Sequence, residues 1–109
     1  MYVNYTLNQI NGDKMQYIMF WEFEPEKREE VIKKLNEIRK EIKSNPNKYP
    51  KFISKNYAMV DGPEGFQLVE TDDPEHLSRF VLHYMPEVRF RFAPIIEVAK
   101  SVELYNKEK

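Results

Sequence analysis

The chain contains no cysteine, only three glycines and no apolar run longer than a few residues. The absence of cysteine excludes disulfide bonds, thiolate metal sites and cysteine nucleophiles, and it is typical of intracellular proteins. Because no apolar stretch resembles a signal peptide or a membrane span, we expect no association with membranes. The sequence therefore predicts a cytoplasmic protein.

An excess of charge of one sign is also lacking. The 17 basic residues are offset by 18 acidic ones, which leaves a formal net charge of -1. Proteins that bind nucleic acid normally carry a basic excess, so no nucleic-acid partner is expected. With 41% hydrophobic residues, a chain of 109 residues can build one packed core. Residues 1–14 are polar and predict an N-terminal tail, whereas residues 15–109 predict a single domain.

Two segments predict strands that are apolar on both faces. Side chains alternate between the two faces of a strand, and both sets are apolar in residues 15–23. One set is Tyr17, Met19, Trp21 and Phe23, and the other includes Ile18 and Phe20. Residues 51–61 show the same two-faced pattern and predict a second strand. A turn cluster at residues 61–65 leads into a third strand at residues 66–71, so these two strands are expected to form a hairpin.

Two amphipathic helices are predicted. One lies between the first strand and the hairpin, and the other lies between the hairpin and a fourth strand. Pro25, with acidic neighbours, is placed to start the first helix. Its apolar residues recur at three- and four-residue spacing and are Val31, Leu35, Ile38 and Ile42. Asp73 is placed to cap the second helix, which carries Pro74 at its first position and stops at Pro86.

The order of these elements predicts an α+β fold of the ferredoxin-like, βαββαβ type. Residues 88–96 supply the fourth strand, in which Pro94 favours an edge position or a bend. After it, helical spacing of apolar residues favours a short terminal helix over a continued strand. Right-handed crossovers would place both helices on one face of a four-stranded antiparallel sheet. The other face would then expose large apolar side chains. Pairing this face with that of a second copy would bury about 800 Å² per subunit, which is the size of a stable interface. We therefore expect a homodimer or higher even oligomer.

Four segments carry a family resemblance. They are YIMFWEFEPEK at residues 17–27, NPNKYPKF at 45–52, GFQLVETDDPEHL at 65–77 and HYMPEVRFRFAPIIE at 83–97. From residue 15 onward the chain resembles the dimeric α/β-barrel superfamily, and within it a small prokaryotic family of unknown function. That superfamily includes cofactorless monooxygenases, haem enzymes, lactone isomerases, ligand-sensing domains and stress proteins, so the resemblance implies a fold and no particular reaction.

A pocket between the sheet and the helices is the expected ligand site. Its predicted lining combines aromatic and polar residues, namely Trp21, Tyr57, Glu70, His83, Tyr84 and Arg91. Each also has a purely structural interpretation. Aromatic residues on strands favour packing, and His83 in the last helical turn favours a capping role. A buried Arg91 needs a carboxylate, which Glu22 or Glu70 could supply.

No metal site and no cofactor are predicted. His76 and His83 are seven residues apart and can share a helix face. A catalytic zinc site needs three protein ligands, however, and the nearest carboxylates lie beside or beyond the helix end. Haem-binding members of the superfamily need an axial histidine, and neither histidine can be assigned to that place.

Small-molecule binding or sensing is the function that these features favour. One alternative is a cofactor-independent monooxygenase or isomerase acting on a small apolar or aromatic substrate, with His83 as acid or base and Arg91 holding developing negative charge. Another is a domain that serves assembly alone. Catalysis predicts polar groups that converge on one cavity, whereas assembly alone predicts a solid interior.

Overall fold

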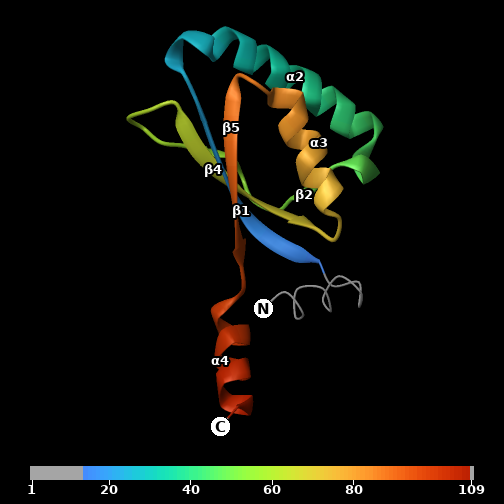
Figure 1. The fold of residues 1–109 in the computed structure, drawn as a ribbon, viewed down its shortest axis with the longest axis vertical. Coiled ribbons are helices and arrows are strands. Elements are labelled where there is room, and N and C mark those ends of the chain that lie inside the picture. The colour runs from blue at the N-terminus through green and yellow to red at the C-terminus, as the bar shows by residue number, and fades with distance from the viewer. Residues whose placement is uncertain (1–13, 109) are drawn as a thin grey trace.

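The computed structural model describes residues 14–108 (Figure 1). The tail expected over residues 1–14 therefore lies, except for Lys14, outside the described residues. In chain order the elements are β1 (Met15–Phe23), the 3-10 turn η1 (Pro25–Lys27), α2 (Arg28–Ser44), η2 (Pro46–Lys48), β2 (Lys51–Phe52), β3 (Tyr57–Ala58), β4 (Glu64–Thr71), α3 (Pro74–Tyr84), β5 (Val88–Ile95) and α4 (Val98–Lys107).

The five strands form one antiparallel sheet with the order β2-β4-β1-β5, and β3 also pairs with β4. Helices α2 and α3 lie together on one face of this sheet (Figure 1). The predicted α+β architecture with an antiparallel sheet is thus confirmed. β5 forms an edge, as Pro94 indicated, and the expected C-terminal helix is present as α4, which extends away from the sheet.

The prediction of a single strand over residues 51–61 is wrong, because the structure has two short strands there, β2 and β3. The backbone leaves the ladder after Ile53, whose N–H donates to the Leu68 carbonyl at 3.0 Å. At the next position the Ser54 hydroxyl, rather than a strand carbonyl, accepts from the Leu68 N–H at 2.8 Å. A side chain thus replaces the backbone as the partner of β4, and residues 54–56 loop outward before β3 resumes pairing.

Side chains on the two faces of β1 are buried to different extents. Tyr17 and Met19 face the helices and are 6% and 2% exposed, whereas Ile18 and Phe20 point to the opposite side and are half-buried. The pairing registers place further apolar residues beside them. We call this side of the sheet the open face. Its half-buried apolar residues are Ile18, Phe20, Phe66, Leu68, Ala93 and Ile95. The sheet therefore has a helix-covered face and a second apolar face.

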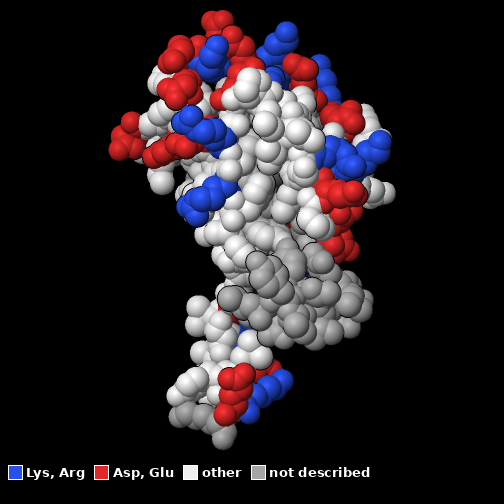
Figure 2. Space-filling view, viewed as in Figure 1, with Lys and Arg blue, Asp and Glu red and all other residues white. Residues whose placement is uncertain are grey.

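Local sequence signals explain where the two packed helices begin. The Asp73 carboxylate accepts from the Glu75 N–H at 2.9 Å, and Pro74 occupies the first turn of α3, so the predicted cap is confirmed. Helix α2 starts one short 3-10 turn after the predicted Pro25. Its outer surface carries acidic and basic side chains that are intermixed (Figure 2). Of its predicted apolar stripe only Ile38 is fully buried.

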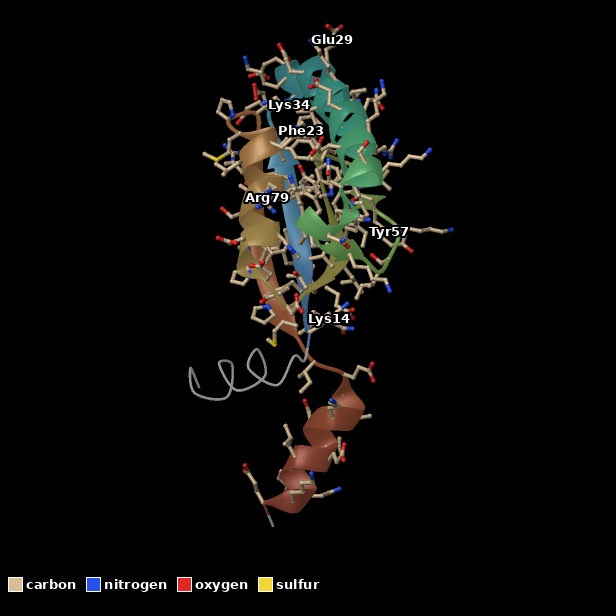
Figure 3. All side chains as sticks on the ribbon, turned by 90° about the vertical axis from the view of Figure 1, so that its right-hand side faces the viewer. Lys14, Phe23, Glu29, Lys34, Tyr57 and Arg79 are labelled. Atoms are coloured by element: carbon tan, nitrogen blue, oxygen red, sulfur yellow. The ribbon has the colours of Figure 1, made fainter. Side chains whose placement is uncertain are left out.

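Polar contacts fasten α2 to the end of α3. Lys34 Nζ lies 2.6 Å from Glu87 Oε2 and donates to the Met85 carbonyl at 2.9 Å. His83 Nε2 lies 2.8 Å from the Lys34 carbonyl, which accepts its hydrogen bond. Figure 3 shows Lys34 on the side of α2 that faces α3. We call these four residues the helix clamp. The hydrogen bond from Lys34 holds the pKa of the Glu87 carboxyl below its usual range.

We expect Glu87→Gln to lower the melting temperature at pH 7 by removing the ionic half of the helix clamp. Because folding lowers the pKa of Glu87, its stabilising effect is present above the usual carboxyl pKa and is lost as the pH falls through the folded value. The deficit should therefore shrink towards low pH in calorimetric scans from pH 7 to pH 3. Glu37→Gln, at an exposed position on α2, is the control. Equal melting temperatures for the two variants at pH 7 would contradict this role.

Candidate functional site

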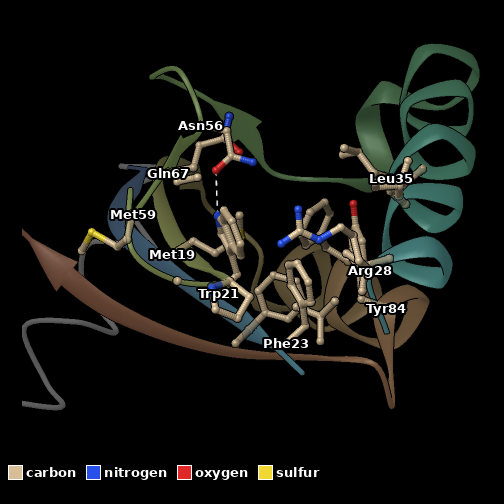
Figure 4. Close-up of a pocket in the computed structure, with 18 of the residues that line it drawn as sticks. Met19, Trp21, Phe23, Arg28, Leu35, Asn56, Met59, Gln67 and Tyr84 are labelled. Atoms are coloured by element: carbon tan, nitrogen blue, oxygen red, sulfur yellow. Dashed lines mark hydrogen bonds between the residues drawn. The ribbon is translucent and has the colours of Figure 1, made fainter. Parts of the chain in front are cut away.

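A cavity of about 870 Å³ lies between α2 and the helix-covered face of the sheet (Figure 4). Aliphatic side chains of α2 form one wall, and aromatic side chains of β1 and β5 form the other. The turn between β3 and β4 contributes to its rim. The principal lining residues are Met19, Trp21, Phe23, Arg28, Val31, Leu35, Ile38, Arg39, Ile42, Phe52, Asn56, Met59, Asp61, Gln67, Phe80, Tyr84 and Phe90. A domain that serves assembly alone is expected to have a solid interior, whereas this structure contains a cavity.

Trp21 is fixed in the wall of the cavity by a hydrogen bond and by stacking. Its indole N–H donates to Asn56 Oδ1 at 2.8 Å, and its ring stacks on Phe23 with centroids 6.0 Å apart. Asn56 comes from the outward loop between β2 and β3. The interruption of the predicted strand therefore supplies the partner that holds Trp21, as the dashed line in Figure 4 shows.

Tyr84 is held in the cavity by an aromatic cluster. Its ring lies 5.2 Å from Phe80, 5.5 Å from Phe90 and 5.2 Å from the His83 ring, measured between centroids. Burial raises the pKa of the Tyr84 phenol to about 12, and the nearby charge of Arg39 acts in the opposite direction. The hydroxyl therefore keeps its proton at neutral pH and can donate a hydrogen bond.

Three charged residues line the cavity, and two of them are arginines. Arg28 and Arg39 form no ion pair within residues 14–108, and neither does Asp61. Amide groups of Asn56 and Gln67 add polar contacts to a lining that is otherwise apolar. Such a surface suits a largely apolar molecule that carries a few polar groups.

Two of the six residues predicted to line a pocket between the sheet and the helices, Trp21 and Tyr84, line this cavity. Glu70 and Arg91 occupy the strand positions that point to the opposite side of the sheet, and Tyr57 stacks there on Phe66 at 5.4 Å. The fourth, His83, belongs to the helix clamp. His83 and Arg91 thus lie on different sides of the sheet, and the pair suggested for catalysis does not converge on this cavity.

The expected partner of Arg91 is also different. The register places Glu22 opposite Arg89, and their side chains pair at 3.2 Å. Glu70 lies opposite Gln16 and accepts from its amide at 3.1 Å. Arg91 instead stacks over the Phe20 ring, 4.3 Å from its centroid. It also lines a smaller cavity of about 290 Å³. The register between the strands decides these partners, and the sequence pattern alone does not determine that register.

Sequence reasoning missed Arg28, Arg39 and Asn56. The two arginines are eleven residues apart, about three helical turns, so they share a side of α2 with Val31 and Leu35. Helical periodicity could therefore have found them as cations beside the apolar stripe. No sequence signal could have found Asn56, because its position depends on the outward loop.

Neither metal ligands nor membrane-spanning helices stand out in the structure. Among residues 14–108, no three side chains of the metal-binding types gather closely enough to hold an ion. Within the same range, no helix is both long enough and apolar enough to cross a membrane.

Comparison with known protein families gives one match. Residues 15–109 match the model of DUF3303, which is described as a domain of unknown function. The chain belongs to this family. The expectation of a family without an assigned function is therefore confirmed, and the broader superfamily stays a prediction. No curated protein and no solved structure matches this DUF3303 chain.

We expect Gly65→Ala to destabilise the protein by about 1–3 kcal/mol, a typical cost of forcing extra atoms into a packed interior. A methyl group at Gly65 would overlap the carbonyl oxygen of Tyr57 and the indole ring of Trp21. The melting temperature should fall and the emission of Trp21 should shift. Gly62→Ala is the matched control, because its nearest neighbour lies 4.0 Å from the added atom. Similar losses in both variants would show that the tight packing at Gly65 is unimportant.

Proposed function

We propose that this protein binds or senses a small, largely apolar molecule in the cavity beneath α2. The observation that carries the proposal is the cavity itself, whose volume of about 870 Å³ is of the size that small-molecule sites have. Its lining joins a continuous apolar wall to a few polar groups, the combination that allows both affinity and selectivity. Ligand sensing accordingly ranks ahead of assembly as the purpose of the fold.

The incomplete burial of α2 supports the same proposal. Val31, Leu35 and Ile42 lie on the apolar stripe but are only half-buried, because they border the cavity. Fully burying a side chain of this size contributes about 1.5–3 kcal/mol. An apolar ligand would bring these three side chains out of water, so its binding should also stabilise the fold.

The chain contains a single tryptophan, and Trp21 lies in the cavity wall, so its fluorescence reports occupancy directly. We expect decan-1-ol or tert-butylbenzene, one aliphatic and one aromatic probe, to change the Trp21 emission saturably and to raise the melting temperature. Leu35→Gln should weaken this binding about tenfold by placing an amide in the apolar wall. Leu82→Gln, at a position 64% exposed on α3, should leave it unchanged.

Melting curves of both variants separate a change in binding from a loss of folding. Absence of saturable emission changes with either probe would refute the proposed function. Equal binding by Leu35→Gln and the wild type would place the ligand elsewhere.

The second part of the proposal is a homodimer of the dimeric α/β-barrel type, built on a ferredoxin-like subunit. The strand order supports the ferredoxin-like assignment, and the open face supports pairing with a second copy. Apolar residues occupy the middle of that face together with Arg91, which stacks over Phe20, while Gln16 with Glu70 and Glu22 with Arg89 occupy its two ends. An apolar centre with a polar rim is the usual organisation of a protein interface.

We expect light scattering to give about twice the subunit mass of 13.2 kDa. Phe20→Glu and Leu68→Glu should each produce monomers, because a carboxylate would enter the apolar centre of the interface. Leu82→Glu, on the exposed side of α3, should stay dimeric. A wild-type protein that is monomeric across the accessible concentration range would rule out this assembly, whatever the variants do.

A further inference from the structure

The Tyr84 hydroxyl is a hydrogen-bond donor without a partner in the described part of the chain. Tyr84 is only 5% exposed, and its known contacts are with aromatic rings. Fully shielded side-chain nitrogen and oxygen atoms within residues 14–108 all have partners, so this hydroxyl is accessible, and Tyr84 lines the cavity. Because the hydroxyl is accessible from the cavity, it can donate a hydrogen bond to an acceptor bound there.

Arg39 supplies positive charge to the same cavity. It is close enough to act on the ionisation of Tyr84, and it forms no ion pair with a described residue. Asp61 is the one carboxylate in the lining, and it lies beyond ion-pair distance of either arginine. The cavity therefore offers a neutral donor and a cation together.

We infer that the ligand is an amphipathic anion, an aliphatic or aromatic monocarboxylate. Its carboxylate accepts a hydrogen bond from the Tyr84 hydroxyl and pairs with Arg39, and its apolar body lies along Val31 and Leu35 towards Trp21. This inference rests on the proposed function and adds the chemical class of the ligand. Hydrogen bonds to charged groups are the strong ones, so the carboxylate gives selectivity that the apolar wall alone cannot give.

Arg28 provides an internal control for the position of the carboxylate. It is the same residue type on the same side of α2, but it lies eleven residues from Arg39, about 16 Å along a helix. The two arginines therefore mark two separate positions along the cavity wall. Lys40, exposed and outside the lining, controls for the loss of one positive charge on α2.

The test compares decanoate, decan-1-ol and decyltrimethylammonium by titration of the Trp21 emission at pH 7. We expect decanoate to bind about tenfold more tightly than decan-1-ol, and the cation to bind most weakly. Tyr84→Phe and Arg39→Gln should each reduce the affinity for decanoate about three- to tenfold and reduce that for decan-1-ol by a smaller factor. Lys40→Gln should affect neither ligand, and Arg28→Gln should reduce the affinity for decanoate less than Arg39→Gln does.

The outcomes separate this inference from the proposed function. Equal affinity for decanoate and decan-1-ol overturns the anionic class but leaves an apolar binding site. Loss of decanoate binding in Arg28→Gln, without loss in Arg39→Gln, overturns the assigned position. Saturable binding of none of the three probes overturns the inference and the proposed function together. Since Tyr84→Phe keeps the aromatic packing, its melting temperature shows whether the site is still folded.

Discussion

The alternation of side chains along β1 is the constraint on which the rest of the structure depends. This strand pairs with β4 on one side and with β5 on the other, so its register fixes which residues of three strands share a face. Met19 and Trp21 turn towards the helices and form the core and the cavity wall, while Ile18 and Phe20 turn towards the open face. A slip of one residue would exchange the two sets. The tight contact of Gly65 with Trp21 opposes such a slip.

Elements whose signals are local were predictable from the sequence. The cap at Asp73, the proline after it and the apolar spacing of α2 each involve neighbours within a few residues, and all are present as expected. The division of the second strand was not predictable. It depends on the Ser54 hydroxyl meeting the Leu68 N–H across fourteen residues of chain. Strand propensity alone favours continued pairing there, and a tertiary contact overrides it.

The candidate site was only partly predictable for a related reason. The alternation of Phe90 and Phe92 with Arg89 and Arg91 is plain in the sequence, but it does not say which set faces the helices. That choice follows from the register with β1, which places Phe90 beside Trp21. Trp21 belongs to the set of β1 side chains that faces the helices, and it lines the cavity. Polar residues on the other strands could be assigned to the pocket only by knowing the pairing.

The helix clamp helps to position α2, and the cavity lies between this helix and the sheet. Its contacts with the end of α3 are directional, since Lys34 and His83 must keep hydrogen-bond geometry with Glu87 and the Lys34 carbonyl. Apolar contacts alone would draw α2 onto the sheet until the cavity closed, because hydrophobic burial has no preferred direction. Polar contacts of fixed length instead define where α2 sits relative to α3. These contacts and the apolar contacts of Ile38 together leave the cavity between α2 and the sheet.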